Sequence, residues 1–378
     1  MAHRLLICAA LSKGGCTVSN ISLSNDIKAT LNCLCALGVK AKKQGNSIYV
    51  DGSGLFSKTD VLDCFESGST LRFFIPLCLM AKTDVTLKGT ERLFSRSLDV
   101  YKTLCDERGF KFYEGSDRVS VNGDLQSGRF VVRGDVSSQF ISGLLFALPM
   151  LKGDSVIEIT GSLESAPYID MTIYAQSLFG VDVKRCGNVI TIKGGSEYKP
   201  TDVTVEGDCS NAAFFDALRV LGHDVSVTGI NQNTLQGDIV FYEYFKKLCE
   251  GAPTLDMSDC PDLAPVVMAV AAAKNGATLT GTKRLKIKES DRGEAMKAEL
   301  AKFGVKTKVY ENKIEVGCGI CAPTEPIESH NDHRIVMACA VLLTKTGGKI
   351  LNAESVNKSF PNFFECLKVL GAEVENEA

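Results

Sequence analysis

The sequence predicts a two-domain protein of mixed α/β class, built from one strand–helix–strand unit that recurs six times. Three observations lead to this prediction. Segments with helical periodicity end repeatedly at a glycine that an apolar strand follows. An alternating strand precedes each of these helices. The segments 140–151 and 263–273 are apolar on every side, as expected of helices packed inside a ring of sheets.

The glycine that ends each helix defines the repeat. Segment 24–37 has apolar residues at helical spacing, ends at Gly38, and leads to a strand near 48–50. The same order recurs before strands at 119–121, 189–192 and 314–316, and it is faintest in the fourth copy. We expect each glycine to form a left-handed helix C-cap, and a Ser or Asp to cap each helix start. The six glycines, of which the first four are spaced by 71 residues, are Gly38, Gly109, Gly180, Gly251, Gly304 and Gly371.

The stretch before each helix also has a shared form: a turn, an alternating strand, a small polar residue and an acid. The six stretches are GGCTVSNISLSND, KTDVTLKGTERLFSRSLD, GDSVIEITGSLESAPYID, GHDVSVTGINQNTLQGD, NGATLTGTKRLKIKESD and GGKILNAESVNKSFPN. Their alternation predicts half-buried strands, and the strand after each helix makes the sheets mixed rather than purely parallel. Six copies predict two domains of three copies each, 1–206 and 207–378.

Composition excludes several classes of protein. The chain has 378 residues, of which 45% are hydrophobic and 23% charged, and this balance is typical of globular cores. A net charge of −3 argues against nucleic-acid binding, and no apolar stretch is long enough to span a membrane. The 15 cysteines lie mostly within apolar patterns, which predicts reduced core residues and a cytoplasmic protein. The motif Cys318-Gly-Ile-Cys321 is more simply a turn than a metal or redox site.

Cations stand at equivalent helix starts of the repeat. A helix start already favours an anion through its amides and dipole, so an added cation strengthens the site. Any one of these side chains is more simply a solvated helix end, but together they predict a cleft for a ligand with several negative charges. Lys288 and Arg292 are four residues apart across the start of a helix at 290–303 and are expected to share a face. The six cations are Arg72, Arg96, Lys288, Arg292, Arg334 and Lys358.

The segment SHNDHRIVMACAV, residues 329–341, is interpreted as a loop-to-helix junction. Asn331 and Asp332 would cap the helix, Arg334 would face the anion, and the apolar run would anchor the helix in the core. A His-x-x-His metal site at His330 and His333 is the less favoured alternative, because metal ligands would require a further carboxylate or cysteine facing the same cleft.

Carboxylates and neutral donors complete the candidate site. Asp262 heads a very apolar helix, Glu289 lies between Lys288 and Arg292, and Asp26 lies in the cap region of the first helix. An acid among cations stays ionised and can serve as a base, although a plain N-cap explains Asp262 equally well. The uncharged hydrogen-bonding residues suited to a phosphate are Ser137, Ser138, Gln139, Ser165 and Tyr168.

Six ordered motifs, ESGSTLRF, GDVSSQF, SAPYID, LKIKESDR, NDHRI and KSFPNFF, resemble the 5-enolpyruvylshikimate-3-phosphate synthase family over essentially the whole chain. The resemblance implies an inside-out α/β barrel in each of two domains hinged around a cleft, with three βαβαββ copies per domain. It also implies transfer of the enolpyruvyl group of phosphoenolpyruvate to the 5-hydroxyl of shikimate 3-phosphate, with release of phosphate. The first domain would be the shikimate 3-phosphate side.

The resemblance further implies residue roles. Asp262 and Lys288 would hold and deprotonate the 5-hydroxyl, and Glu289, with His333 and Asp26, would manage the proton at the methylene carbon of phosphoenolpyruvate. The residues implied to bind shikimate 3-phosphate are Arg4, Ser137, Ser138, Gln139, Ser165, Tyr168, Asp262 and Lys288. Those implied to bind phosphoenolpyruvate are Gly68, Arg96, Gln139, Arg292, Arg334 and Lys358. No cofactor and no metal are expected.

Two features depart from the family pattern. Glu66 stands where many members have Asn, beside the glycine of the phosphoenolpyruvate site. The family's Lys-Ser pair, which precedes x-Ala-His-Arg, is missing because the chain begins at Met1-Ala2-His3-Arg4. We expect either a gene start assigned too late, which is favoured, or a true truncation. As written, the chain is expected to have poor activity and an unpaired sheet edge within 207–378.

Other functions remain open at this level. A catalytically impaired anion-binding homologue is one alternative, because the lysine is missing. An enolpyruvyl transferase acting on UDP-N-acetylglucosamine and an RNA-end-processing relative of similar fold are less favoured. The enzyme that acts on UDP-N-acetylglucosamine should lack SSQF followed by SAPYID. The acidic balance of the chain disfavours the RNA-end-processing relative. We expect a monomer that binds small molecules and neither nucleic acid nor membrane.

Overall fold

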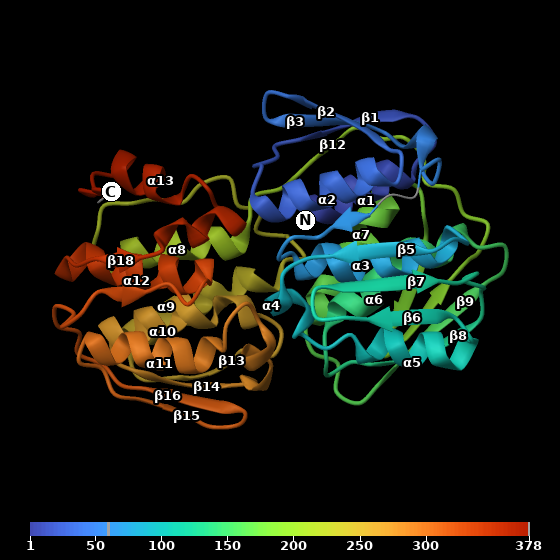
Figure 1. Ribbon diagram of the computed structural model, residues 1–378. Coiled ribbons are helices and arrows are strands. Elements are labelled where there is room, and N and C mark those ends of the chain that lie inside the picture. Colours follow the sequence, from blue (N-terminus) through green and yellow to red (C-terminus); the bar gives the residue numbers. More distant parts are fainter. Residues whose placement is uncertain (59–60, 377–378) are drawn as a thin grey trace. The chain divides into compact units, whose positions relative to one another are not determined.

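The computed structural model describes residues 1–58 and 61–376 and contains two compact units, 1–206 and 207–378. Each unit has a hydrophobic core of its own, with strands and helices that alternate along the chain (Figure 1). The predicted mixed α/β class is confirmed by this architecture.

Unit 1 (1–206) contains three four-stranded sheets of the same design. In each sheet one strand pairs in parallel with a neighbour on one side and antiparallel with a neighbour on the other, so the sheets are mixed as predicted. The strand orders are β12-β1-β3-β2, β4-β5-β7-β6 and β8-β9-β11-β10. The strands are β1 (Gly15–Ser19), β2 (Lys40–Gln44), β3 (Ser47–Asp51), β4 (Leu62–Asp63), β5 (Val85–Lys88), β6 (Lys111–Glu114), β7 (Arg118–Asn122), β8 (Arg129–Arg133), β9 (Ser155–Thr160), β10 (Val183–Cys186), β11 (Val189–Ile192) and β12 (Val203–Thr204).

Three helices of unit 1 form the interior that the sheets surround. In α3 every residue from Thr70 to Leu79 is buried, and α1 and α6 are buried along almost their whole length. Because these segments carry apolar side chains on every side, they lose exposed apolar surface only by packing on all faces. The α-helices of the unit are α1 (Ala2–Leu11), α2 (Asn25–Ala36), α3 (Gly68–Met80), α4 (Glu91–Phe94), α5 (Asp99–Arg108), α6 (Ser138–Ala147) and α7 (Ala166–Leu178), with short 3₁₀ turns η1 (Gly52–Gly54) and η2 (Leu148–Met150).

Unit 2 (207–378) follows the same plan with fewer strands. The apolar helices α10 and α12 pack against each other in its core. Its α-helices are α8 (Cys209–Val220), α9 (Phe241–Glu250), α10 (Ala264–Ala273), α11 (Arg292–Lys302), α12 (His333–Thr346) and α13 (Phe363–Val369). Its 3₁₀ turns are η3 (Gly237–Val240), η4 (Pro261–Leu263), η5 (Lys283–Ile287) and η6 (Ala353–Lys358), and its strands are β13 (Thr254–Asp256), β14 (Ala277–Thr280), β15 (Thr307–Val309), β16 (Lys313–Val316), β17 (Ile327–Glu328) and β18 (Ile350–Leu351).

The predicted glycine caps are confirmed in five copies and wrong in one. Gly38, Gly109, Gly180, Gly304 and Gly371 have φ values of 100°, 67°, 79°, 81° and 95°. Gly251, which follows α9, has φ 173° and is extended. The fourth copy, the faintest in the sequence, therefore leaves its helix by a different route.

The predicted strand before each helix is also confirmed in five copies, as β1, β5, β9, β14 and β18. It is wrong in the fourth copy, where 224–228 has no strand. Val225 and Val227 are half-buried against the core of unit 2, so the alternation is real, but a strand also needs a hydrogen-bonded neighbour. Within the described chain, no strand pairs with this segment.

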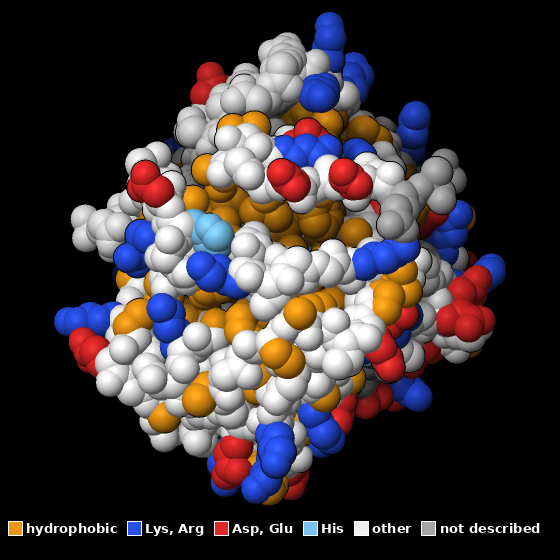
Figure 2. Space-filling model, turned by 90° about the vertical axis from the view of Figure 1, so that its left-hand side faces the viewer, with side chains coloured by type: hydrophobic (Ala, Val, Ile, Leu, Met, Phe, Trp, Pro, Cys, Tyr) orange, Lys and Arg blue, Asp and Glu red, His pale blue; other side chains and the backbone are white. Residues whose placement is uncertain are grey.

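Two sheets of unit 2 differ in size. One has four strands, in the order β13-β14-β16-β15, whereas β17 and β18 pair with each other alone among the described residues. Figure 2 shows one face of the molecule, with a hollow floored by apolar side chains and rimmed by charged ones. The unpaired edge expected within 207–378 stays a prediction.

No helix in the described part of the chain is long and apolar enough to cross a membrane.

Candidate active site

In unit 2, three cations converge on the carboxylate of Asp262. Arg292 Nη1 donates to Asp262 Oδ1 at 2.8 Å, and Lys288 Nζ donates to the same oxygen at 3.1 Å. Arg334 Nη2 donates to Oδ2 at 3.3 Å, and its Nη1 donates to the backbone oxygen of Asp262 at 3.1 Å. These residues come from η4, from the segment before α11, and from the first turns of α11 and α12. Separate copies of the repeat therefore deliver them to one place.

Burial and charge act in opposite directions on this cluster. Burial would raise the pKa of Asp262, but Arg334, Lys288 and Arg292 outweigh burial and hold that pKa well below its usual range. Burial also lowers the pKa of Lys288, although Asp262 opposes the change. A buried ionised carboxylate beside a lysine that loses its proton more easily is a suitable pair for removing a proton from a hydroxyl.

Arg292 is the most buried member of the cluster, with a side chain only 1% exposed. Besides Asp262, it donates to Glu289 Oε2 at 2.6 Å and to Asp332 Oδ2 at 2.9 Å. Burial alone would lower the pKa of Arg292, but these carboxylates raise it above its ordinary value. Arg292 therefore fixes three acids around one guanidinium. Sequence reasoning identified two of the acids as site residues and Asp332 only as a cap.

The expectation that Lys288 and Arg292 share a helical face is wrong, although the two side chains do meet. Helix α11 begins at Arg292, and Lys288 lies outside it at the end of η5. The two side chains nevertheless reach the same oxygen of Asp262, because the turn between them brings Lys288 back toward the helix start. Arg96 likewise does not open a helix, since α5 begins at Asp99.

The junction before α12 has the predicted cap at Asp332, but the expectation that Asn331 also caps the helix is wrong, because Asn331 lies in the left-handed turn before the cap. Asp332 caps the helix, with Oδ1 accepting from the backbone N–H of Arg334 at 3.0 Å. His333 is 5% exposed, and burial lowers its pKa to about 4, so the imidazole is neutral at pH 7. The Nδ1 of His333 has no hydrogen-bond partner among the described residues. Lys358 Nζ donates to the backbone oxygen of Asn331 at 2.6 Å, so it too belongs to this junction.

A further buried acid lies near this cluster. Asp238, in η3, is 4% exposed and accepts a hydrogen bond from the hydroxyl of Ser210. Burial, together with the charge of Asp262, raises the pKa of Asp238 to about 6, while Arg334 opposes the change. Asp238 is the acid that ends the fourth repeated stretch, NTLQGD, but its sequence signal gave no reason to expect burial.

In unit 1, two guanidinium groups crowd the start of α3. A Cβ added to Gly68 would lie 2.7 Å from Arg96 Nη1 and 2.9 Å from Arg72 Nη1. Both arginines are buried, and Arg72 Nη1 donates to Gln139 Oε1 at 3.2 Å. Gln139 in turn donates to Ser69 Oγ at 2.9 Å. A helix start with two cations and no side chain at its first residue is suited to an anion.

Polar side chains at two further helix starts of unit 1 are the remaining predicted residues. Ser137 caps α6 by accepting from the backbone N–H of Gln139, and Ser138 begins that helix. Ser165 precedes α7 with a left-handed φ of 58°. Arg4 donates to the backbone oxygen of Tyr168 at 3.0 Å and stands 5.9 Å from the centre of its ring.

Two groups of predicted residues are thus brought together, one in each unit. Asp26 lies in the first turn of α2 in unit 1, whereas Asp262 and Glu289 belong to unit 2. Arg72 was expected only as one of several cations, and its hydrogen bond to Gln139 now ties it to the residues at the start of α3.

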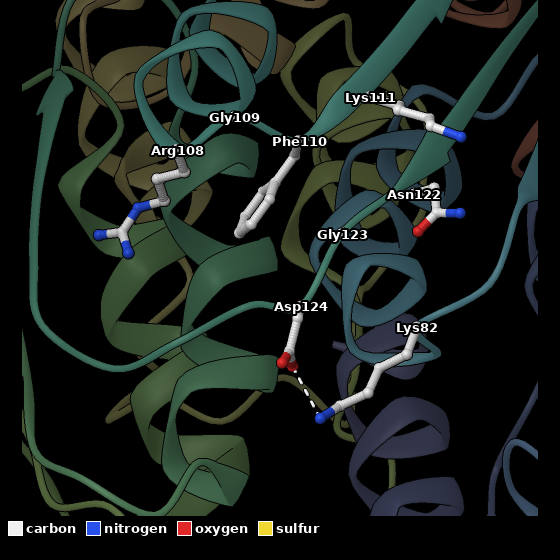
Figure 3. A pocket seen from close by; sticks show the side chains of 8 residues that line it. All are labelled: Lys82, Arg108, Gly109, Phe110, Lys111, Asn122, Gly123 and Asp124. Atoms are coloured by element: carbon white, nitrogen blue, oxygen red, sulfur yellow. Dashed lines mark ion pairs between the residues drawn. The ribbon is translucent and has the colours of Figure 1, made fainter.

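A separate surface pocket of about 480 Å³ lies between the end of α5 and strands β6 and β7. Its eight lining residues include none of the predicted site residues, and its Lys82 is paired with Asp124 at 2.9 Å (Figure 3). Arg108, at its edge, stacks over Phe130 with 4.1 Å between the guanidinium carbon and the ring centre. Because none of the predicted site residues lines this pocket, it is not the candidate site.

Comparisons with known proteins identify the family of this chain. The family model of EPSP synthase (3-phosphoshikimate 1-carboxyvinyltransferase) matches residues 1–252 and 248–367. The 3-phosphoshikimate 1-carboxyvinyltransferase of Clostridium kluyveri is 39% identical over 398 residues, covering 99% of this chain and 93% of that relative. The protein of the same name from Clostridium acetobutylicum is 38% identical over 399 residues, with the same coverage.

A solved structure supports the fold. The EPSP synthase of Acinetobacter baumannii aligns with a TM-score of 0.78 at 23% identity, covering 98% of this chain and 93% of that one. The two-domain inside-out α/β fold that the resemblance implied is therefore confirmed. Since the family match and the relatives extend over nearly the whole sequence, the chain belongs to the EPSP synthase (3-phosphoshikimate 1-carboxyvinyltransferase) family.

Proposed function

We propose that the cation groups of this chain serve an enolpyruvyl transfer between two phosphorylated metabolites. The chain is a 3-phosphoshikimate 1-carboxyvinyltransferase: it transfers the enolpyruvyl group of phosphoenolpyruvate to the 5-hydroxyl of shikimate 3-phosphate and releases phosphate. In the shikimate pathway this step leads toward the aromatic amino acids. The observation that carries the assignment is the full-length family match.

Asp262, the cations that contact it and the acids that Arg292 holds are called the Asp262 group. This group is proposed to act on the 5-hydroxyl of shikimate 3-phosphate. Asp262 and Lys288 would hold the hydroxyl and take its proton as the oxygen attacks the enol carbon of phosphoenolpyruvate. The ionised state of Asp262 and the lowered pKa of Lys288 support this role. Arg4, Ser137, Ser138, Gln139, Ser165 and Tyr168 are proposed to bind the rest of this substrate.

Phosphoenolpyruvate is proposed to bind the guanidinium groups. Gly68, Arg96 and Gln139 at the start of α3, and Arg292, Arg334 and Lys358 in unit 2, are the proposed contacts. Positive side chains neutralise a phosphate and a carboxylate, and preorganised charges of this kind are commonly the largest contribution to catalysis. Arg334 supports the assignment best, because it reaches both a side-chain and a backbone oxygen of Asp262 and so stands beside the proposed base.

Proton transfer at the methylene carbon is proposed for Glu289, with His333 and Asp26. The carbon gains a proton when the 5-oxygen adds to the enol and loses a proton when phosphate leaves, so the site must supply an acid for the first step and a base for the second. Glu289 is held by Arg292 at 2.6 Å, which fixes its orientation. His333 is buried, and burial keeps its imidazole neutral at pH 7.

The test is phosphate release from purified protein with both substrates, with each substrate alone as the control. Asp262→Asn is expected to lower kcat by about 10²- to 10⁴-fold, the usual contribution of general acid–base catalysis. Glu294→Gln is the matched control, because Glu294 is an exposed acid on α11 that pairs with Lys297. Release that does not require shikimate 3-phosphate, or equal activity of both variants, would contradict the proposal.

We also propose that the chain works as a cytoplasmic monomer on small molecules, without nucleic acid. The cysteines support a reducing compartment, because all 15 are free and most are buried.

A further inference from the structure

The segment that leads into α12 adopts an unusual backbone. His330 and Asn331 are consecutive non-glycine residues in the left-handed region, with φ values of 51° and 52°. This conformation is disfavoured for residues with a Cβ and persists where the surroundings impose it. Asp332, which accepts a hydrogen bond from Arg292, follows at once, and Arg334, which donates to Asp262, lies two residues further on. The strained turn therefore sets the position of two members of the Asp262 group.

A buried carboxylate holds the turn from the side. Glu299, in the last turns of α11, is 1% exposed, and its Oε1 accepts from His330 Nε2 at 2.7 Å. Its Oε2 accepts from the backbone N–H of Glu328 at 3.0 Å and pairs with Lys302 Nζ at 2.8 Å. Lys302 also donates to the backbone oxygen of Pro326 at 2.8 Å. One end of α11 thus grips both the backbone and a side chain of the segment 326–330.

Helix α11 contacts the segment at two points. Its first residue, Arg292, binds Asp332, and its last turns carry Glu299, which binds His330. Two attachments on one rigid helix fix both the position and the rotation of the turn between them. A single attachment at Arg292 would leave the turn free to relax toward ordinary backbone angles.

We propose that the Glu299–His330 pair is a positioning device for the reaction, which holds the turn at 329–332 so that Asp332 and Arg334 meet their partners. Neither residue is required to touch a substrate. The inference rests on the proposed function, since its kinetic consequence depends on Arg334 and Lys358 binding phosphoenolpyruvate. Lys358 belongs to the same device, because its ammonium group binds the backbone oxygen of Asn331 inside the turn.

The test compares two replacements of His330. His330→Phe keeps a ring but removes the donor, whereas His330→Gln keeps an N–H that can reach Glu299. We expect the Phe variant to raise the KM for phosphoenolpyruvate roughly tenfold, equivalent to losing one hydrogen bond to a charged group, with a smaller change for shikimate 3-phosphate. We expect the Gln variant to stay near the wild-type values.

The control is His223→Phe. His223 Nε2 also makes one hydrogen bond to α12, at 2.9 Å to Thr344 Oγ1, but at the far end of that helix. This variant should lower thermal stability as much as His330→Phe while leaving the KM for phosphoenolpyruvate unchanged. An equal rise of KM in both variants would show that loss of stability alone causes the effect, and would overturn the proposal.

A second measurement does not depend on turnover. Amide hydrogen exchange of 329–334 should be faster in His330→Phe than in the wild type and restored in His330→Gln. Unchanged exchange in the Phe variant, or failure of a folded Gln variant to restore exchange, would overturn the proposal. Faster exchange without a change in KM would also overturn it. If the wild type releases no phosphate, the proposed function fails, and exchange alone decides whether Glu299 holds the turn.

Discussion

Gly68 is a residue whose missing side chain is explained by its neighbours. The backbone at Gly68 is not left-handed, so any residue could adopt its angles. Space is the constraint, because Arg96 and Arg72 place guanidinium nitrogens within 3 Å of where a Cβ would lie. A methyl group there would push away the charges proposed to bind phosphoenolpyruvate.

We therefore expect Gly68→Ala to raise the KM for phosphoenolpyruvate by about tenfold or more, the equivalent of about 1.4 kcal/mol of lost binding. The KM for shikimate 3-phosphate should change less, and thermal stability should change little, because flexible side-chain ends can move. Steady-state kinetics with each substrate varied in turn measures this. Gly251→Ala, where nothing lies within 4 Å of an added Cβ, is the control, and equal effects at both glycines would contradict the explanation.

His333 gives the protein a dependence on pH. Its folded-state pKa of about 4 is below the ordinary value of 6.5, because burial disfavours the charged ring. As pH falls from 6.5 toward 4, the unfolded chain binds a proton at this histidine and the folded chain does not, so the free energy of unfolding decreases. The change is about 1.4 kcal/mol per pH unit for one proton.

His333→Gln should remove this contribution. Urea unfolding of both proteins between pH 4.5 and 6.5 measures this contribution as the difference between their free energies of unfolding. The difference cancels the contributions of other groups, among them Asp238, which titrates in the same range and changes stability in the opposite direction. The variant should lose less stability than the wild type as pH falls. Two parallel curves would mean that folding does not lower the pKa of His333.

The residues that sequence patterns could identify are those at helix starts. Asp262, Lys288 and Arg334 were all expected there, and all three meet. The patterns could not show that Arg292 is buried among three carboxylates, because burial depends on what the other copies of the repeat place around a helix start. Asp238 escaped notice for the same reason.

At the scale of elements, the six glycines that follow the helices differ in backbone conformation, so a change to alanine should have different effects at different copies. Gly304 is left-handed with φ 81°, and an added Cβ would lie 2.9 Å from Cys321 Sγ. Gly251, at the equivalent point of the fourth copy, is extended and has open space around it. Only the first of these positions requires glycine.

Gly304→Ala should therefore lower the free energy of unfolding by about 1–2 kcal/mol, the cost of a left-handed residue with a Cβ. Gly251→Ala should leave it unchanged or raise it by up to about 1 kcal/mol, since alanine restricts the unfolded chain. Chemical unfolding of both variants provides the comparison within a single unit. Equal destabilisation would mean that the fourth copy keeps the usual cap in solution.

The fourth copy also shows what periodicity can and cannot predict. Val225 and Val227 alternate and are half-buried, as their pattern requires, yet 224–228 is not a strand. Alternation reports which side of a segment faces the core. Pairing depends on a neighbour that can be far away in the sequence, and such a neighbour leaves no trace in the local pattern.

At the scale of the whole molecule, the sequence predicted the number of copies and the kind of fold, since both depend on a repeat that can be read along the chain. Each unit has its own core, built around the most apolar helices of its three copies. The proposed site residues lie at or near helix starts, so the rigid interior supports residues that differ from copy to copy.

The pairing of β12 with β1 has a consequence for synthesis. Val203 and Thr204 align with Val18 and Ser19, so the final residues of unit 1 complete the sheet that its opening residues begin. A ribosome must release nearly all of this unit before that sheet can close. Strand β1 therefore has one edge without its hydrogen-bonded neighbour until β12 has been synthesised. Slow translation or a bound chaperone would matter most for this part of the nascent chain.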